Sequence, residues 1–450
     1  MELRPFPGAV RAAVLDGMAQ FQVPGAAVGV VHEGQRYAEA FGVTNVRHPL
    51  PVTPQTLFQV GSTSKTFTAT AVMQLVEAGA VELDATVRSY LPEFRLQSED
   101  DAARVTVRDL LTHHGGFVGD LFENTGRGSD ALARMVERLA GQAQVVPAGH
   151  AFSYSNAGFY TLGRIIEVVT GLGFERAIRG RLLRPLGLAM SYYFPEEAIT
   201  HRVAAGHILT ADGPEVASPW ATPRSISPGG GLISNVLDQL SWATFHMGDG
   251  RAPGGEPVLA RASLEQMQER QRPAGSICPW IGLSWMLSDL GGVRIVAHGG
   301  ATNGQLSAFE FAPERGYACT VLTNSDSGRG LRPVVTEACR EAFMGVKADP
   351  PIRSDGKLDL GSCTGTYTMV LATMRVTEED GGLVVLEQPM QMDGRIAPLA
   401  PPATRLVITG PDTGAVVEGP RRGETCEFLR GDDGKVRFMR WDGRLATRQE

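Results

Sequence analysis

A serine and a lysine stand three residues apart near the start of the chain, as Ser62 and Lys65 in the segment Gly-Ser-Thr-Ser-Lys. On a helix this spacing brings both side chains onto one face, about 5 to 6 Å apart at their Cβ atoms. A serine hydroxyl becomes a good nucleophile when a base removes its proton. A lysine amine serves as that base when burial and the helix dipole disfavour its charged form. The pair therefore has the chemistry of an activated nucleophile.

Lys65 is also the only lysine in the first 346 residues, although the 450-residue chain holds 42 lysines and arginines together. Arginine keeps its proton at any ordinary pH, whereas a lysine can become neutral. The only lysine in this part of the chain therefore lies where a side chain that can lose its proton is useful. A competing interpretation is an N-capping serine followed by a solvent-facing lysine. It is weakened because Phe67, Val72 and Leu75 make the following helix a core element.

Two further polar motifs follow along the chain. Tyr-Ser-Asn at 154–156 comes just before a helical pattern at 157–170, and His-Gly-Gly at 298–300 follows the strand-like run 293–297. A tyrosine can exchange a proton with a reacting group, and an asparagine amide both donates and accepts hydrogen bonds. Taken singly, the plainer interpretations are a loop in which Asn156 caps the helix and a lone strand histidine.

Taken in order, Ser62-x-x-Lys65, Tyr-Ser-Asn and His-Gly-Gly resemble the three motifs of the penicillin-recognising serine hydrolases. That family includes class C β-lactamases, D-alanyl-D-alanine carboxypeptidases, D-aminopeptidases and related esterases. The segment Leu-Leu-Thr-His-His-Gly-Gly at 110–116 is similar to a stretch between these motifs in the family. The resemblance covers about residues 10 to 345.

The resemblance implies a role for each motif residue. Ser62 would form an acyl-enzyme, while Lys65 and Tyr154 would share the base and acid functions. Asn156 would hold Lys65 and the substrate amide by hydrogen bonds. A tyrosine serves in this way if nearby positive charge lowers its pKa from about 10. The backbone N–H groups of Ser62 and Ala301 would stabilise the oxyanion of the tetrahedral intermediate.

The third motif departs from the Lys-Thr-Gly that relatives often carry, because its first residue is His298. A histidine is largely neutral at pH 7 and gives no dependable positive charge for a substrate carboxylate. The family's D-aminopeptidases also carry histidine here, so the resemblance favours small peptides, amides or esters over penicillins. We expect His298, Gly299, Gly300 and Asn303 to contribute to the site, with a plain turn residue as the alternative for Asn303.

Three functions stay open at this stage. The first is a serine hydrolase of the peptidase, D-aminopeptidase or esterase type that acts through an acyl-enzyme. The second is a β-lactamase or a penicillin-binding D-Ala-D-Ala carboxypeptidase. The third is a binding or sensor protein that kept the fold without turnover, against which the complete motifs argue.

Other classes of protein lack their usual signatures here. His113 and His114 have no metal-ligand spacing, and the glycines at 229–231 have no following Lys-Ser/Thr to hold a phosphate, so we expect neither metal nor cofactor. The net charge of −7 without a basic stripe disfavours nucleic acid, and no apolar run has the length of a membrane span. Five cysteines without C-x-x-C spacing, and no signal-peptide pattern, favour the cytoplasm. The expected partner is a small-molecule or peptide substrate.

The surrounding elements predict an α/β (α+β) catalytic domain at 1–348. Strand patterns lie at 26–42 and again from about 281 to 323, with mostly helical sequence between them. This order predicts one sheet closed by the two ends of the domain, with a helical subdomain beside it. The resemblance likewise implies a β-lactamase/transpeptidase-like fold with an antiparallel sheet. Ser234 is expected to cap a helix of its own.

The sequence changes character after residue 348. Residues 349–361 have the composition of a linker, and short β-prone runs separated by Gly and Asp turns fill 362–450. This predicts an all-β module, either a sandwich or a small barrel, and the module resembles the lipocalin-like barrel domains of some peptidases in the family. Two roles stay open for it, limiting access to the active site and joining copies into a homo-oligomer.

Overall fold

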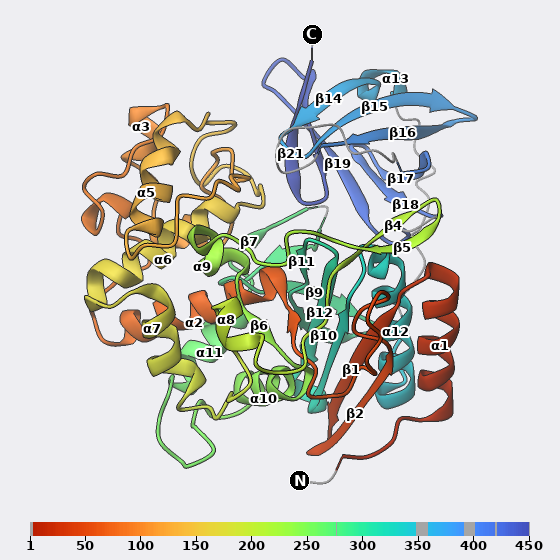
Figure 1. Ribbon diagram of the computed structural model, residues 1–450. Helices are drawn as coiled ribbons and strands as arrows, with labels where there is room; N and C mark the ends of the chain where they lie inside the picture. Colours follow the sequence, from red (N-terminus) through yellow and green to blue (C-terminus); the bar gives the residue numbers. More distant parts are fainter. Residues whose placement is uncertain (1–2, 276, 348–358, 391–400, 419–420, 450) are drawn as a thin grey trace.

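The computed structural model describes residues 3–275, 277–347, 359–390, 401–418 and 421–449 (Figure 1). They form an α+β domain with a central sheet and helices, followed by a separate closed β-barrel. The predicted fold class is therefore confirmed. The expected linker at 349–361 lies outside the described residues except for its last three positions.

The two ends of the α+β domain meet in one nine-stranded antiparallel sheet, in the order β2-β1-β13-β12-β10-β9-β8-β7, with β11 pairing β12. β1 (Gly25–His32) and β2 (Gln35–Gly42) come from its start, and β13 (Tyr317–Thr323) from near its end. β1 pairs with β13 from Ala26 opposite Thr323 to His32 opposite Tyr317. The other strands of the sheet are β7 (Arg272–Pro273), β8 (Trp280–Ile281), β9 (Met286–Leu290), β10 (Val293–Ala297), β11 (Gly300–Thr302) and β12 (Gln305–Ala312).

Helices cover both faces of this sheet (Figure 1). α1 (Gly8–Phe21) and α12 (Gly328–Met344) pack together on one face, where Val14, Val28 and Leu331 belong to one apolar cluster. On the other face, α10 (Val236–Met247) lies so close to β1 that a Cβ at Gly29 would be 2.5 Å from Cγ2 of Val236. Burial of these apolar side chains is the main force that holds the layers together.

The cap of α10 differs from the prediction. Asn235, not Ser234, precedes the helix with an extended backbone, and its side chain accepts a hydrogen bond of 2.9 Å from the backbone N–H of Asp238. Ser234 lies in β6 (Ile233–Ser234), which pairs with β3 (Phe58–Gln59). Both residue types cap helices well, and the strand pairing decides between them.

The helical subdomain surrounds α2 (Ser64–Glu77), which is buried from its first residue to Met73. The glycine-rich segment is one helical turn, α9 (Ser227–Gly230), packed on α2 and α6 (Asn156–Thr170), although its composition is typical of a loop. A Cβ at Gly229 would lie 2.7 Å from the ring of Tyr160, so glycine is needed for close packing here. The remaining elements of this domain are α3 (Glu99–Ala102), α4 (Val107–Leu111), α5 (Ala131–Arg138), α7 (Phe174–Ile178), α8 (Pro195–Ala198), α11 (Arg261–Gln268), β4 (His207–Thr210) and β5 (Gly213–Val216).

The C-terminal module is a closed antiparallel barrel whose strands follow sequence order from β14 to β21. β14 (Gly365–Met369) pairs with β21 (Arg444–Arg448) and closes it. Tyr367 and Trp441 are among the large side chains buried inside. Of the two predicted architectures, the barrel is correct. Its other strands are β15 (Ala372–Glu379), β16 (Gly382–Pro389), β17 (Thr404–Gly410), β18 (Thr413–Val416), β19 (Thr425–Arg430) and β20 (Val436–Trp441).

The barrel contacts the α+β domain through the turn between β20 and β21. The backbone N–H of Tyr154 donates to the carbonyl of Gly443 at 2.8 Å, and the N–H of Leu445 donates to Oγ of Ser153 at 3.2 Å. Nε of Arg440 donates to the carbonyl of Phe152 at 3.1 Å. One turn of the barrel is therefore fixed to the short segment that precedes α6.

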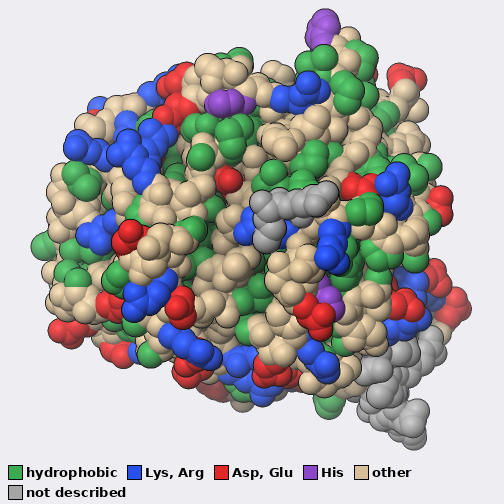
Figure 2. Space-filling view, turned by 90° about the horizontal axis from the view of Figure 1, so that it is seen from below, with side chains coloured by type: hydrophobic (Ala, Val, Ile, Leu, Met, Phe, Trp, Pro, Cys, Tyr) green, Lys and Arg blue, Asp and Glu red, His purple; other side chains and the backbone are tan. Residues whose placement is uncertain are grey.

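The surface carries mixed charge. Figure 2 shows Lys and Arg side chains interspersed with Asp and Glu over the described residues of the face seen from below. None of the helices in the described part of the chain has the length and apolar character needed to cross a membrane.

Candidate active site

Ser62 and Lys65 lie at the start of α2. Ser62 is in a short 3₁₀ turn, Gly61–Thr63, directly before the helix, and Lys65 is in the first turn of the helix. Ser62 is partly exposed, whereas Lys65 is fully buried. Nζ of Lys65 lies 3.1 Å from Oγ of Ser62. The two side chains are thus placed to share a proton.

Two carbonyl groups hold the amine of Lys65. Nζ donates to Oδ1 of Asn156 at 2.7 Å and to the backbone carbonyl of Gly229 at 2.6 Å. A neutral amine has two N–H bonds and one lone pair, and a carbonyl oxygen can only accept. In the neutral form both hydrogens are directed to the carbonyls and the lone pair faces the hydroxyl of Ser62, whereas in the ammonium form the third N–H donates to Oγ of Ser62.

The surroundings of Lys65 favour this neutral form. Burial, and then the charge of Arg444, lower the pKa of Lys65 well below its usual value, while Asp120 acts to raise it. Nζ also lies 4.9 Å from the centre of the Tyr154 ring. Lys65 is therefore equipped to accept the proton of the nucleophile.

Tyr154 approaches the nucleophile from the segment before α6. Its hydroxyl is hydrogen-bonded to Ser62, and its ring stacks on His113 with 4.2 Å between the ring centres. Burial raises the pKa of Tyr154 above its usual value, although the bond to Ser62 and the charge of Arg444 act to lower it. A lowering of the Tyr154 pKa by positive charge was the condition for its role in proton transfer, and it is not met, because desolvation outweighs the charge of Arg444. Tyr154 keeps its proton and suits the acid role.

Asn156 is the first residue of α6, but it does not cap the helix. Ser155 is the cap, and its Oγ accepts from the backbone N–H of Gly158 at 3.0 Å. The interpretation of Asn156 as a cap is therefore wrong. Its amide instead spans two partners, since Oδ1 accepts from Lys65 and Nδ2 donates to Oδ1 of Asp120 at 2.8 Å.

Asp120 and Arg444 complete this network, and neither was predicted from the sequence. Nε of Arg444 donates to Oδ2 of Asp120 at 2.5 Å, and its Nη2 donates to Oδ1 at 3.2 Å. Their side chains are 15% and 6% exposed, for Arg444 and Asp120 respectively. The guanidinium lies 5.0 Å from the centre of the Tyr154 ring. No motif could have revealed a pair separated by 324 positions.

The backbones of the first and third motifs touch. A Cβ on Gly300 would lie 1.9 Å from the carbonyl oxygen of Val60 and 2.7 Å from the nitrogen of Ser62. Gly61 has φ +53°, and a Cβ there would lie 2.5 Å from the nitrogen of Ala301. Glycine is required at both positions, because no side chain fits between the chains. This approach brings together the backbone nitrogens of Ser62 and Ala301.

His298 is buried beside this contact as a neutral acceptor. Its Nδ1 lies 2.6 Å from the carbonyl oxygen of Gly299 and must donate to it, so Nε2 carries the lone pair of a neutral ring. Burial, and then the charge of Lys65, lower the pKa of His298 to about 3. Among the described residues, Nε2 has no hydrogen-bond partner. The ring centre lies 6.3 Å from that of Tyr154.

Asn303, His113 and His114 are hydrogen-bonded to backbone groups and not to Ser62 or Lys65. Asn303 is in the turn between β11 and β12, where its Nδ2 donates to the carbonyl of Pro219 at 3.1 Å. Nδ1 of His113 accepts from the backbone N–H of Ser155 at 3.0 Å, and Nδ1 of His114 donates to a backbone carbonyl at 2.7 Å. Burial lowers the pKa of both histidines. Across the described residues, no group of His, Cys, Asp and Glu side chains is placed to hold a metal ion.

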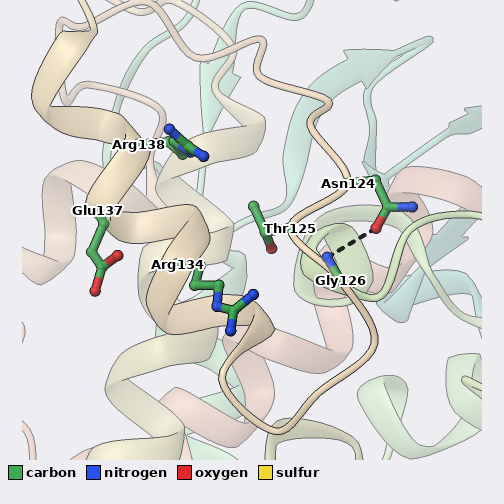
Figure 3. A pocket seen from close by; sticks show the side chains of 6 residues that line it. All are labelled: Asn124, Thr125, Gly126, Arg134, Glu137 and Arg138. Atoms are coloured by element: carbon green, nitrogen blue, oxygen red, sulfur yellow. Dashed lines mark hydrogen bonds between the residues drawn. The ribbon is translucent and has the colours of Figure 1, made fainter.

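A separate hollow of about 620 Å³ lies on the helical subdomain beside α5 (Figure 3). Its arginines pair with carboxylates, Arg134 with Asp130 at 2.6 Å and Arg138 with Glu123 at 3.4 Å. None of the residues that line it belongs to the Lys65 network. They are Asn124, Thr125, Gly126, Arg134, Glu137 and Arg138.

Comparison with known proteins identifies the family. The family model described as Beta-lactamase matches residues 10–344. The chain therefore belongs to the beta-lactamase family, and it is a serine hydrolase. Penicillin-binding protein 4 of Amycolatopsis lactamdurans is 41% identical to it over 363 residues, which cover 77% of this chain and 94% of that protein.

Solved structures share the arrangement. The crystal structure of SurE with D-Leu superposes with a TM-score of 0.76 at 26% identity, over 98% of this chain and 99% of that one, so the similarity includes the C-terminal barrel. D-amino acid amidase from Ochrobactrum anthropi SV3, complexed with L-phenylalanine amide, has a TM-score of 0.63 at 23% identity, over 74% of this chain and 98% of that one. The second structure shares the fold of the α+β domain.

Proposed function

We propose that this serine hydrolase cleaves small peptides, amides or esters through an acyl-enzyme on Ser62, with Lys65 as the base and Tyr154 as the acid. The main observation is the position of Nζ of Lys65, which is fully buried and lies 3.1 Å from Oγ of Ser62. Both N–H bonds of the neutral amine go to carbonyl oxygens, at 2.7 and 2.6 Å, and leave the lone pair for Ser62.

The acylation step follows from these positions. Oγ of Ser62 attacks the substrate carbonyl carbon while its proton passes to Lys65. The oxyanion faces the backbone N–H groups of Ser62 and Ala301. As the bond to the leaving nitrogen or oxygen breaks, Tyr154 gives that atom a proton and regains one from the Lys65 ammonium. In deacylation, Lys65 takes a proton from the attacking water and returns it to Oγ of Ser62 as the acyl–oxygen bond breaks, so that the acid product leaves and both side chains regain their starting forms.

We favour substrates with a D-configured residue at the acyl side. The support is the likeness to SurE, whose structure contains D-Leu, over nearly the full length of both chains. A neutral His298 also suits a substrate that offers an N–H donor, because its Nε2 can only accept.

Binding of penicillins is the second candidate, since the relative with 41% identity is named a penicillin-binding protein. Against it stands the neutral His298, which gives no charge for the carboxylate of a penicillin. Labelling with a fluorescent penicillin and hydrolysis of nitrocefin separate the two candidates. We expect both the labelling and the hydrolysis of nitrocefin to be much slower than turnover of the preferred ester.

The test of the main proposal uses matched D- and L-amino acid p-nitroanilides and p-nitrophenyl esters, with the intact mass of the protein followed during turnover. We expect faster release from the D series and a mass increase equal to the acyl group. The Ser62→Ala variant should show neither. An unmodified mass during rapid turnover, or full activity of Ser62→Ala, would contradict the proposal.

For the barrel, we favour the role at the active site, because its β20–β21 turn is bonded to residues 152–154. A homo-oligomer formed through the barrel remains a prediction that the solution mass of the full chain tests. A cytoplasmic location also remains a prediction.

A further inference from the structure

A row of hydrogen bonds links Arg444 of the barrel to Asp120, Asn156 and Lys65, and the chemistry of the first two residues fixes which group donates at each bond. Arg444 carries only donors, and the Asp120 carboxylate carries only acceptors. The amide of Asn156 can point either way, but Nδ2 must face Asp120 at 2.8 Å if that bond is to form. Oδ1 of Asn156 must then face Lys65. The orientation of the amide is thus decided by Asp120.

We infer that Arg444 and Asp120 are positioning residues that fix the amide of Asn156 in one orientation and thereby set Lys65 as the base for Ser62. This inference rests on the proposed function. Neither residue touches the nucleophile in the described structure. Each acts through Asn156, and the active site is therefore assembled from both domains.

The ion pair between Arg444 and Asp120 has the geometry needed to hold the Asp120 carboxylate in place. The two bonds of Arg444 to the carboxylate form a fork, which holds a planar partner in one orientation better than a point charge does. Both side chains are largely removed from water, so their pairing is weakly screened. Without Arg444, Asp120 would be left as a buried charge with no cation bonded to it.

The barrel holds Arg444 in place through the turn that precedes it. Gly443 has φ +75°, which suits the tight turn, and its carbonyl accepts from the backbone N–H of Tyr154. Leu445, on the other side of Arg444, bonds to Ser153. The contact between the β20–β21 turn and residues 153–154 therefore fixes both Arg444, which supports the base, and Tyr154, which serves as the acid.

Arg444 and Asp120 are also the charged groups that face Lys65. Three other titratable side chains lie around the amine, Tyr154, His113 and His298. Burial keeps the tyrosine protonated and both histidines neutral. Removing either member of the ion pair should therefore change the proton affinity of Lys65 in a direction set by the charge that is lost.

The test compares Asp120→Asn and Arg444→Met in the full-length protein, with kcat/KM measured from pH 4 to 9 on the best ester of the panel. Each substitution should lower kcat/KM at the optimum about 100-fold, because the base is misplaced. Asp120→Asn removes a negative charge, so the acid limb should move about one unit to lower pH. Arg444→Met removes a positive charge, so that limb should move about one unit to higher pH.

The double variant Asp120→Asn/Arg444→Met distinguishes positioning from a general loss of structure. In Asp120→Asn alone, one amide oxygen must serve both Arg444 and Asn156. Once the arginine is gone, that oxygen is available to Nδ2 of Asn156. The double variant should therefore be more active than Asp120→Asn, with an acid limb close to that of the wild type.

Arg437→Met is the matched control, because Arg437 makes an exposed pair with Asp433 on the same barrel. It should leave kcat/KM and the pH profile unchanged. Three results would overturn the inference. The first is a wild-type pH profile for Asp120→Asn and Arg444→Met, and the second is a loss of kcat/KM in both without opposite shifts of the acid limb. The third is a double variant whose loss of kcat/KM is the sum of the two single losses. Loss of the proposed function would look different, since the wild type would then form no acyl-enzyme on Ser62.

Discussion

The two sides of Ser62 differ in how completely their polar atoms are paired. Toward Lys65, the amine, the Asn156 amide and the Asp120 carboxylate are all bonded to one another or to backbone carbonyls. Toward the third motif, Nε2 of His298 and Oγ1 of Thr302 are buried without a partner among the described residues. The chain of Lys65, Asn156 and Asp120 is a finished network, although Nε2 of the neighbouring His113 also lacks a partner, and the other side of Ser62 has unused hydrogen-bonding capacity.

This difference separates two tasks. A proton acceptor must be ready before substrate arrives, so its partners belong to the protein. A recognition surface must leave a bond for the substrate to make, because a buried polar group without a partner discriminates against ligands that cannot supply one. We expect changes on the Lys65 side to affect all substrates, and changes on the His298 side to depend on the substrate.

The largest effect is expected for Lys65→Arg. Arginine keeps a positive charge but cannot act as a base at ordinary pH, so kcat/KM should fall by about 1,000-fold or more for every substrate. The thermal melt should remain cooperative. Lys435→Arg, at an exposed position of the barrel, is the control and should be fully active. Near-normal turnover by Lys65→Arg would show that Lys65 is not the base.

The next effect concerns the contact between the first and third motifs. In Gly300→Ala, the new methyl group would meet the carbonyl of Val60 and the nitrogen of Ser62, and β11 must move away. The loss of one oxyanion donor should lower kcat about 100-fold, with little change in KM. Gly180→Ala has open space around the added carbon and serves as the control. Equal activities of the two variants would contradict the assignment of Ala301 to the oxyanion site.

A smaller and selective effect is expected for His298→Phe. Loss of one neutral acceptor should lower kcat/KM up to about tenfold for a substrate that offers an N–H donor. The N-methylated analogue should be affected much less. A similar loss for both substrates would show that the His298 side is not a recognition surface.

The pH profile of the wild type tests whether His298 changes its protonation state in the working range of the enzyme. Burial and the charge of Lys65 lower the pKa of His298 to about 3, so its protonation should leave no inflection near pH 6.5. As the pH falls, the loss of activity should follow protonation of Lys65 alone. An inflection near 6.5 that disappears in His298→Phe would place a titrating histidine in the mechanism.

The smallest effect is expected in the hollow beside α5. Arg138 pairs with Glu123 at the surface, with side chains 65% and 51% exposed. Such pairs contribute about 0 to 1 kcal/mol to stability. Arg138→Ala should change kcat/KM less than twofold, which steady-state kinetics on the same ester would measure. A large loss would mean that the active site reaches this hollow.

Local patterns predicted the parts of the site that depend on local geometry. The spacing of Ser62 and Lys65 follows from the helical repeat, and the apolar residues of α2 indicate its burial. The strand patterns at both ends of the α+β domain indicate one sheet, and the regular short strands after residue 360 indicate an all-β module without deciding between a sandwich and a barrel. Each of these features is encoded within a few neighbouring residues.

The missed features depend on tertiary packing. Asp120 and Arg444 have no sequence signal, because they meet only when the barrel docks on the segment before α6. The pKa of Tyr154 rises because burial outweighs the nearby arginine, and burial of a loop residue cannot be judged from its neighbours. The glycines of α9 are typical of a loop, yet close packing against Tyr160 places them in a helical turn.

The most direct test of the account is the protonation state of Lys65 in the resting protein. The chain has four lysines, at 65, 347, 357 and 435, so a ¹³C-lysine NMR titration contains few signals. The signal that is absent in Lys65→Arg should titrate well below the usual lysine pKa, while that of Lys347, whose pKa is raised by its bond to Glu341, should titrate above it. A Lys65 signal with an ordinary lysine pKa would contradict the claim that the finished side of Ser62 presents a neutral base.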